Sequence, residues 1–365
     1  MTKEDDRKIK ICFVLPALNA GGAQRIMSFL SQNIDTSKFD CRLLVIAKAE
    51  STDFDVTHAN VHYFDKDRLL DVVRPLFLYY AKHKPDIVMG SIGHVNKLHA
   101  LYSFLLRKTN FIAREASINS IMSKYNRSTH ITGFVWLFKT YRKHLKHIVC
   151  QSEQMADYMH EDHGIPKNRI TIINNPLTVE AGVKKPLNNK TKQLITIGRL
   201  SPEKGHERIL NILAKLDTDW HYTIIGEGNQ YENIMQQIKD LGLEDNITYI
   251  KYTSHVSQYL KESDLFLQGS YVEGFPNAVM ESCAVGTPVV AFEAPGGTRE
   301  IIQNNVNGFI SKDEDDYLNN LKIALYEKQW DDKEIHKSII DKFDKSIIIN
   351  KYEELFLNIA QANKF

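Results

Sequence analysis

The sequence is poor in cysteine and has no long apolar run. Its 365 residues include only four cysteines, which stand far apart, and no pair has the spacing of metal ligands. We therefore expect neither a disulfide framework nor a zinc site. No apolar run approaches the roughly 18 residues of a membrane span, and the first residues lack a signal-peptide cleavage pattern. These absences predict a cytoplasmic protein that does not cross a membrane.

Acidic residues are missing from one segment. Between residues 116 and 152 there is no Asp or Glu, although the net charge of the chain is only +1. The cations there are Lys124, Arg127, Lys139, Arg142, Lys143 and Lys146. "GFVWLFKTYRKHLKHI" at 133–148 mixes cations with aromatic residues, which predicts an amphipathic helix there. Residues 124–147 would then contact an anionic membrane surface, the inner face of the cytoplasmic membrane. A basic solvated face over an apolar stripe would explain the pattern about as well.

The residues that are present suit a globular α/β protein. A hydrophobic content of 43% with 25% charged residues is ordinary, and the length suits two domains of roughly 150 to 200 residues. Strands are predicted at 8–18, 40–48, 85–91, 110–115 and 147–152, and helices at 21–34, 72–84, 97–108 and 153–164. Strands that alternate with helices of this length predict right-handed crossovers and a parallel, doubly wound sheet.

A polar stretch separates this half from a second half of the same kind. The same alternation returns from "QLITIGRL" at 193–200 to "PVVAF" at 288–292. The predicted parts are an N-terminal domain at 1–178, a linker at 179–192, a second domain at 193–346 and a final helix at 347–365. Two doubly wound domains should form a cleft between the carboxyl ends of their strands, where such sheets bind ligands.

Two glycine-rich turns lead from predicted strands into helices. "LNAGGAQR" places Gly21 and Gly22 at such a turn, and "EAPGGTREII" does the same with Gly297 and Thr298. Glycine lets the backbone approach a ligand closely, and the start of a helix offers N–H groups to an anion. A tight turn without a ligand would explain these glycines nearly as well.

A basic loop follows the first strand of the second domain. In "TIGRLSPEKGHERIL", Arg199 and Lys204 stand between a strand and a helix, where both cations could contact a phosphate. On its own the pattern fits a solvated basic loop better. The position at the carboxyl end of a strand favours a functional role.

Two glutamates lie in "YVEGFPNAVMESCAVGTPVVA" at residues 271–291. If a helix begins near Pro276 or Asn277, Glu273 precedes it and Glu281 lies roughly one turn inside. The two carboxylates could then contact different parts of one ligand, whose hydroxyl groups would satisfy a buried Glu281. The alternative is that Glu281 is a residue of the helix surface.

Together and in this order, these four stretches resemble the retaining glycosyltransferases of family 4, which have the GT-B fold. The resemblance also includes "VCQSEQMADYM", "IPKNRITIINNPL" and "NNVNGFI", so it covers nearly the whole chain. It implies two Rossmann-like domains that face each other across a cleft, with a C-terminal helix that crosses back to the N-terminal domain. It also implies transfer of a sugar in bacterial surface-polysaccharide synthesis.

The resemblance implies roles for the matching residues. Arg199 and Lys204 would hold the diphosphate of a nucleotide sugar and stabilise the leaving group. Glu281 would bind the ribose and Glu273 the transferred sugar. The further donor contacts would be Gly22, Tyr252, Thr253, Gly274, Phe275, Pro276, Asn277, Gly297 and Thr298. In this family the donor phosphate is thought to help deprotonate the acceptor, so we expect neither a metal nor another cofactor.

The acceptor side of the resemblance is less complete. Some relatives have a histidine or an Arg-Asn pair where this chain has Arg114 and Glu115. Glu115 is a candidate for proton handling and thus for a catalytic role, with a structural salt bridge as an equally good explanation. Gly21, His94 and Arg114 are further candidates for acceptor contact.

Several functions stay open at this point. We expect a UDP-hexose or UDP-N-acetylhexosamine as donor, with a GDP-sugar as the alternative, and a glycan or polyprenyl-linked acceptor. A UDP-sugar epimerase of the same architecture, or a non-catalytic GT-B subunit that binds a glycan or a partner, would fit the fold. We expect no nucleic-acid partner.

Overall fold

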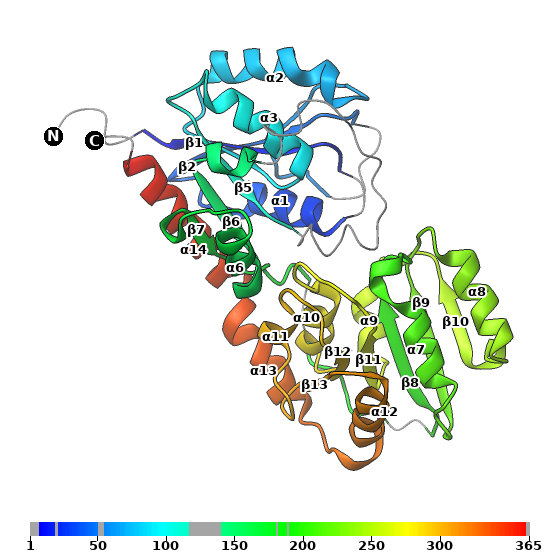
Figure 1. Cartoon of the computed structure of the whole chain (residues 1–365). Helices are drawn as coiled ribbons and strands as arrows, with labels where there is room; N and C mark the ends of the chain where they lie inside the picture. Colours follow the sequence, from blue (N-terminus) through cyan, green and yellow to red (C-terminus); the bar gives the residue numbers. More distant parts are fainter. Residues whose placement is uncertain are drawn as a thin grey trace. The chain divides into compact units, whose positions relative to one another are not determined.

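The chain forms two compact units, each built on one parallel sheet. The computed structural model describes residues 7–18, 21–49, 55–116, 140–179, 182–187 and 190–362. Of these, the first unit contains the residues up to Ala116, those from 140 to Thr178, and those from Lys345 onwards. The second unit extends from Val179 to Asp344. The predicted doubly wound α/β class is confirmed for both units (Figure 1).

The first unit contains a seven-stranded sheet in the order β3-β2-β1-β4-β5-β6-β7. Neighbouring strands pair in parallel, with Ile11 of β1 opposite Cys41 of β2 and Ile87 of β4. The strands are β1 (Ile9–Leu15), β2 (Phe39–Val45), β3 (Val61–Tyr63), β4 (Ile87–Gly90), β5 (Asn110–Arg114), β6 (His147–Cys150) and β7 (Ile170–Ile172).

The helices of the first unit connect these strands. They are α1 (Gly22–Asn33), α2 (Leu69–His83), α3 (Gly93–Ser103) and α6 (Glu153–Glu161), with the 3₁₀ turns η1 (Tyr141–His144) and η2 (Lys167–Arg169). The Ser152 side chain caps α6 by accepting a hydrogen bond from the Met155 N–H at 3.3 Å.

The amphipathic helix predicted around residues 133–148 is wrong for its described part, because residues 141–144 form a 3₁₀ turn and β6 begins at His147.

The last helix, α14 (Lys345–Gln361), completes the core of the first unit. Its buried Phe356 contacts the rings of Phe13 in β1 and Phe39 in β2 edge-on, with centroids 6.1 and 6.2 Å apart. A helix that follows the second unit in sequence therefore packs in the first, which confirms the predicted crossing of the C-terminal helix.

The second unit contains a six-stranded sheet in the order β10-β9-β8-β11-β12-β13, again parallel throughout. Its strands are β8 (Lys192–Ile197), β9 (Trp220–Ile225), β10 (Ile247–Ile250), β11 (Leu265–Gln268), β12 (Val289–Phe292) and β13 (Gly308–Ser311). Its helices are η3 (Pro202–Lys204), α7 (His206–Leu213), α8 (Tyr231–Asp240), η4 (Glu244–Asn246), α9 (Val256–Lys261), α10 (Asn277–Ala284), α11 (Thr298–Ile301), α12 (Glu314–Lys322), the π-helical η5 (Ile323–Glu327) and α13 (Asp332–Phe343).

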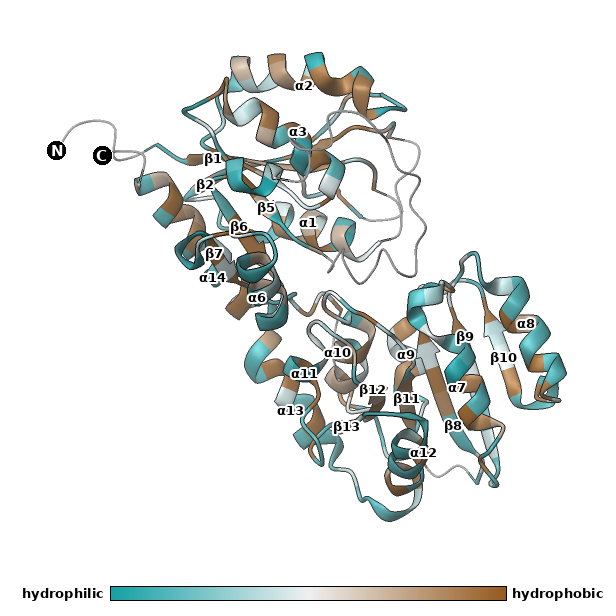
Figure 2. Cartoon of the chain, viewed as in Figure 1, coloured by the Kyte–Doolittle hydropathy of each residue, from teal (hydrophilic) through white to brown (hydrophobic). Residues whose placement is uncertain are grey.

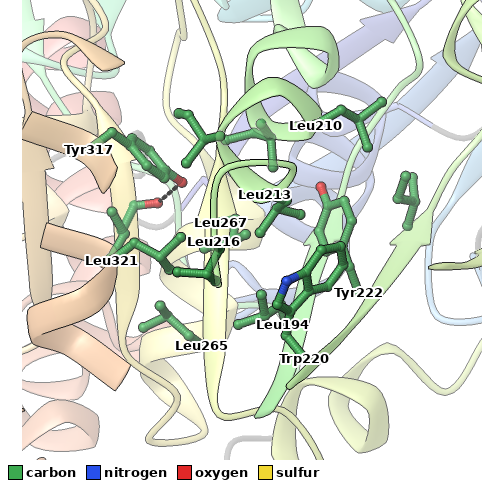
Figure 3. Close-up of a cluster of buried hydrophobic side chains, with 14 of the residues drawn as sticks. Leu194, Leu210, Leu213, Leu216, Trp220, Tyr222, Leu265, Leu267, Tyr317 and Leu321 are labelled. Atoms are coloured by element: carbon green, nitrogen blue, oxygen red, sulfur yellow. Dashed lines mark hydrogen bonds between the residues drawn. The ribbon is translucent and has the colours of Figure 1, made fainter. Parts of the chain in front are cut away.

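Apolar side chains of the strands and helices form a core on one face of this second sheet. Figure 3 shows Leu210 and Leu213 of α7 together with Leu194 of β8 and Trp220 of β9. The buried Tyr317 hydroxyl donates a hydrogen bond to the Val290 carbonyl at 2.8 Å, which satisfies its one polar atom. The outer helices α8 and α12 are largely hydrophilic (Figure 2). The sheet is thereby held rigid beneath the loops at its carboxyl edge.

Candidate active site

The two loops with the strongest sequence motifs meet at one point of the second sheet. The strand order runs one way from β8 through β9 to β10 and the other way from β11 through β12 to β13, so β8 and β11 flank the point of reversal. The loop at 198–205 leaves the carboxyl end of β8, and the loop at 269–276 leaves that of β11. Open parallel sheets bind ligands at such a switch point.

Lys204 and Glu273 form the central ion pair of this site. The Lys204 ammonium donates a hydrogen bond to Oε1 of Glu273 at 2.6 Å. The same oxygen accepts hydrogen bonds from Ser270 Oγ at 2.6 Å and from Gln268 Nε2 at 3.2 Å. Oε2 takes part in none of these bonds, and Lys204 uses one of its three N–H donors in them. The pair is therefore fixed in place while both groups keep capacity for a ligand.

Arg199 stands in the same loop as Lys204 with its side chain exposed. Its guanidinium forms no ion pair or hydrogen bond with any residue of the described ranges. Its backbone, however, is fixed, because the buried His206 ring lies with Nε2 3.1 Å from the Arg199 carbonyl oxygen. An exposed cation on a fixed backbone can bind an arriving anion.

Close backbone contacts hold the loops of this site together. A Cβ atom at Gly205, where φ is +58°, would overlap the carbonyl oxygen of Gly269. A Cβ atom at Gly296, where φ is +121°, would overlap the carbonyl oxygen of Glu273. Side chains at either position would push away the loop that carries Glu273. The glycines thus position the carboxylate rather than merely permit turns.

The backbone N–H of Gly297 already donates a hydrogen bond within the chain. The acceptor is the Gly274 carbonyl at 3.0 Å, so the N–H does not point freely at a phosphate as predicted. Thr298 begins the four-residue helix α11, and its buried hydroxyl has no hydrogen-bond partner among the described residues. The ring of Phe275 packs edge-on against Phe343 at 5.4 Å, which leaves only its backbone for a ligand.

The predicted helix start and the buried glutamate are both observed. The helix α10 begins at Asn277, with Pro276 as its N-cap. Glu281 lies inside this helix with 4% of its surface exposed, so it is not a residue of the helix surface. It already interacts within the chain, so ligand hydroxyls are not needed to satisfy it. It can still share its carboxylate with a ligand.

Tyr252 and Thr253 follow β10, at the far edge of the sheet from β13. Tyr252 is 71% exposed, and the Thr253 hydroxyl accepts a hydrogen bond from the His255 N–H at 3.0 Å. Both residues stand at the carboxyl edge of the sheet, two strands away from β8. A flat exposed ring at this edge suits stacking on a base.

A third loop of the site went unnoticed in the sequence. Gly226 and Gly228 follow β9, and Cβ atoms there would overlap the carbonyl oxygens of Gly198 and Leu200 respectively. The Leu200 N–H also donates to the Glu227 carbonyl at 2.9 Å. The motif "IIGEG" after a strand, next to "TIGRL", was the signal that could have shown it.

In the first unit, the glycine turn and His94 follow neighbouring strands. Gly21 is the N-cap of α1 after β1, and Gly22 is the first residue of that helix. His94 lies in the first turn of α3 after β4, and burial together with the Lys97 charge lowers its pKa. Because β1 and β4 flank the point where the first sheet reverses its order, these residues lie at that unit's switch point.

Arg114 and Glu115 are structural in their contacts. The buried Arg114 guanidinium donates to the Tyr352 hydroxyl of α14, to Ser91 Oγ and to the Asn175 side chain. Glu115 forms a bidentate ion pair with Arg142, at 2.8 and 3.1 Å, and both are nearly fully buried. These contacts favour the salt-bridge explanation of Glu115 over a role in proton handling.

The same ion pair corrects the membrane prediction at one residue. Arg142 is 5% exposed and bound to Glu115, so it cannot contact a lipid surface. Residues 124–139 of the predicted surface lie outside the described residues.

No helix of the described part is long and apolar enough to cross a membrane. Nor does that part contain three or more His, Cys, Asp or Glu side chains grouped to hold a metal ion, and metal independence stays a prediction.

Two family models match the chain. The model described as Glycosyl transferases group 1 matches residues 180–342, and the model described as Glycosyltransferase Family 4 matches residues 20–181. The chain belongs to these glycosyltransferases. In this glycosyltransferase, the range that matches the first model includes Arg199, Lys204, Glu273 and Glu281. The range that matches the second includes Gly21, Gly22 and Glu115.

Relatives of this glycosyltransferase include enzymes that build bacterial glycans. It is 22% identical over 315 residues to the N-acetylgalactosamine-N,N'-diacetylbacillosaminyl-diphospho-undecaprenol 4-alpha-N-acetylgalactosaminyltransferase of Campylobacter jejuni, covering 82% of this chain and 85% of that one. It is 24% identical over 332 residues to the lipopolysaccharide 1,6-galactosyltransferase of Salmonella typhimurium, covering 82% and 84%. The structure of Anabaena HepE in complex with UDP-glucose matches with a TM-score of 0.79 at 19% identity, over 96% of this chain and 100% of that one. That likeness supports the GT-B fold.

Proposed function

We propose that this glycosyltransferase moves a hexose or N-acetylhexosamine from a UDP-sugar to a glycan or polyprenyl-linked acceptor, with retention of configuration, in bacterial surface-polysaccharide synthesis. The acceptor class is supported by the named activities of the Campylobacter and Salmonella relatives. The donor nucleotide is supported by the HepE complex with UDP-glucose. In this proposal the protein works in the cytoplasm and needs no metal or other cofactor.

The observation that carries the proposal is the Lys204–Glu273 pair at the switch point. A cation with two further N–H donors stands beside a carboxylate with one oxygen outside the network, and Arg199 extends from the same loop. A nucleotide-diphosphate sugar offers the matching groups, because its phosphates accept hydrogen bonds and its sugar hydroxyls donate them.

In this proposal, different residues of the second unit bind different parts of such a donor. Lys204 and Arg199 hold the diphosphate and stabilise the charge that develops on it as the sugar leaves. Glu273 Oε2 accepts hydrogen bonds from sugar hydroxyls, beside the backbone of residues 274–277. Glu281 binds the ribose, and Tyr252 and Thr253 lie next to the base. The N–H of Thr298 adds a donor to the phosphates.

The residues of the first unit serve the acceptor in this proposal. Gly21 and His94 stand at its switch point, where an acceptor sugar would bind. Gly22 would approach the donor phosphate. The departing phosphate takes the proton of the attacking hydroxyl, so no protein nucleophile is needed. Glu115 and Arg114 then have a structural role, because their contacts stabilise the carboxyl end of β5.

The test combines a donor screen with one substitution. Purified protein is screened for thermal stabilisation and sugar transfer with UDP-, GDP- and ADP-sugars, because a bound donor raises the melting temperature by mass action. We expect stabilisation and transfer with a UDP-hexose or UDP-N-acetylhexosamine. Lys204→Ala should then lower kcat about 10²–10³-fold, because a charge on the leaving group is no longer stabilised.

Lys215→Ala is the matched control, since Lys215 is exposed and pairs with the exposed Glu314 at 3.3 Å. It should leave turnover unchanged. Near-normal turnover of Lys204→Ala would overturn the assignment of the donor site. Interconversion of the free UDP-sugar without any acceptor would instead show an epimerase, and absence of both binding and turnover with every donor would show a non-catalytic subunit.

A further inference from the structure

A pocket lies on the first unit, away from both switch points. Its volume is about 700 Å³, and its walls come from β2, β3 and α2. None of its lining residues follows β1 or β4, and β3 is the edge strand of the sheet. A volume of this size accommodates a small molecule of metabolite size. The donor and acceptor sites proposed above do not explain it.

The pocket is lined by cations and has no carboxylate in its wall. Arg42, Arg74 and Lys82 are permanent cations, and His62 and His83 stand beside them. Asp40 lies behind the wall, 3.9 Å from the Arg42 guanidinium, and is its nearest counter-charge among the described ion pairs. Three positive charges against this one carboxylate leave an excess positive potential in the cavity.

Aromatic rings hold Arg42 in a fixed position. Its Nη1 donates a hydrogen bond to the Tyr79 hydroxyl at 3.3 Å and lies 3.3 Å from His83 Nδ1. The rings of Tyr79 and His83 stack at 4.2 Å, and His62 lies 4.9 Å from Tyr79. Burial, then the charges of Arg42 and Lys82, lower the pKa of His83, which leaves its ring neutral and able to accept from Arg42.

Helix stability alone does not account for these cations. Lys82 and His83 lie in the last turn of α2, where positive charge stabilises any helix. Arg74, however, lies two turns earlier, and Arg42 and His62 belong to β2 and β3. Positive groups from three separate elements therefore converge on one cavity.

We propose that this pocket binds a phosphate or diphosphate group. Tyr79 and His83 hold Nη1 of Arg42, so Arg42 can donate to such an anion from Nε and Nη2. The exposed Arg74 and Lys82 can close on the anion. The apolar Pro75 and Leu78 beside them suit the organic part of a phosphate ester. The site is separate from the donor diphosphate site of the second unit, and so goes beyond the proposed function.

The test uses inorganic pyrophosphate as the probe and calorimetry as the measurement. All variants carry Lys204→Ala, so that binding at the proposed donor site is weakened. Adding Arg74→Gln and Lys82→Gln should weaken pyrophosphate binding about tenfold or more, because two charge-assisted contacts are lost. Adding Arg107→Gln and Lys108→Gln removes the same charge from exposed positions outside the pocket and should change affinity less than about twofold.

Equal loss in the two charge pairs would overturn the proposal, and so would loss of all binding by Lys204→Ala alone. UDP binding by chains with an intact Lys204 should be the same with and without the two pocket substitutions. It therefore reports on the donor site independently of this pocket. A vesicle co-sedimentation experiment then identifies the source of the phosphate. Pocket-dependent binding to phosphatidylcholine vesicles that contain polyprenyl diphosphate shows a lipid-linked ligand, whereas binding of free pyrophosphate alone shows a soluble one.

Discussion

At the scale of single residues, the proposed donor site depends on one oxygen atom. Oε1 of Glu273 accepts hydrogen bonds from Lys204, Ser270 and Gln268. These bonds fix the orientation of the carboxylate without a ligand and leave Oε2 outside the network. Such preorganisation lowers the cost of ordering the site when the transition state forms.

Glu273→Gln should therefore lower kcat/KM about 10- to 100-fold with little change in stability. The amide keeps the shape but loses the charge that binds sugar hydroxyls. Stability changes little because Lys204, its ion-pair partner, is partly exposed. Glu314→Gln, at the exposed pair with Lys215, is the control for loss of one carboxylate and should leave kinetics unchanged. Unchanged kcat/KM in Glu273→Gln would show that the carboxylate does not contact the sugar.

The Glu115–Arg142 pair leads to the opposite expectation. Glu115→Gln should destabilise the protein by about 3–5 kcal/mol in urea unfolding, because it leaves a buried guanidinium without its counter-charge. Replacing both residues by Leu and Met should recover most of this loss, because the buried charges are then removed together. Turnover per folded molecule should stay normal in the double variant. A large fall in its kcat would restore the catalytic role for Glu115.

At the scale of elements, loop packing controls the positions of the proposed donor-binding groups. Gly296→Ala should lower donor affinity and stability together, because its Cβ would overlap the carbonyl of Glu273 and displace that loop. Gly242→Ala is the matched control. Gly242 also has a positive φ, +66°, but nothing lies within 4 Å of an added Cβ, so only the backbone strain of about 1–2 kcal/mol applies. Equal donor affinity in the two variants would contradict the positioning role of Gly296.

Much of the element pattern could be predicted from the sequence, because strands and helices differ in period and both halves alternate regularly. The short strands β3 and β13 were missed, since β3 has only three residues and β13, "GFIS", has only two large apolar residues. The helix expected around residue 142 failed for another reason. Arg142 belongs to a surface stripe by spacing, but its partner Glu115 is 27 residues away, and no local pattern shows such a pair.

Some features of the candidate site could likewise be predicted from the sequence, and others could not. Arg199, Lys204, Glu273 and Glu281 stand in loops and helix starts that local patterns could identify. The engagement of the Gly297 N–H and the contact of Gly226 with Gly198 depend on how separate loops pack. Tertiary packing of this kind has no signal in the spacing of residues along one chain.

At the scale of the whole molecule, the chain folds into two units that are not two continuous pieces of sequence. The first core is the apolar cluster that α14 shares with β1 and β2, and the second core is that of the second unit. The first core needs α14, whose Phe356 is fully buried between β1 and β2 residues, although the second unit stands between them in the sequence. The second core contains residues of the second unit alone. A defect in α14 should thus act on the first unit.

Phe356→Ala should destabilise the first unit by about 3–5 kcal/mol, because it leaves a cavity in that core. With Trp136 replaced by Phe, the fluorescence of Trp220 and Trp330 reports on the second unit, while far-ultraviolet circular dichroism reports on both. In urea, the dichroism should show an earlier transition and the fluorescence midpoint should not move. Phe104→Ala, at a ring 49% exposed in the first unit, should cost less than about 1 kcal/mol. Equal shifts of both signals in Phe356→Ala would mean that the two cores unfold as one cooperative structure.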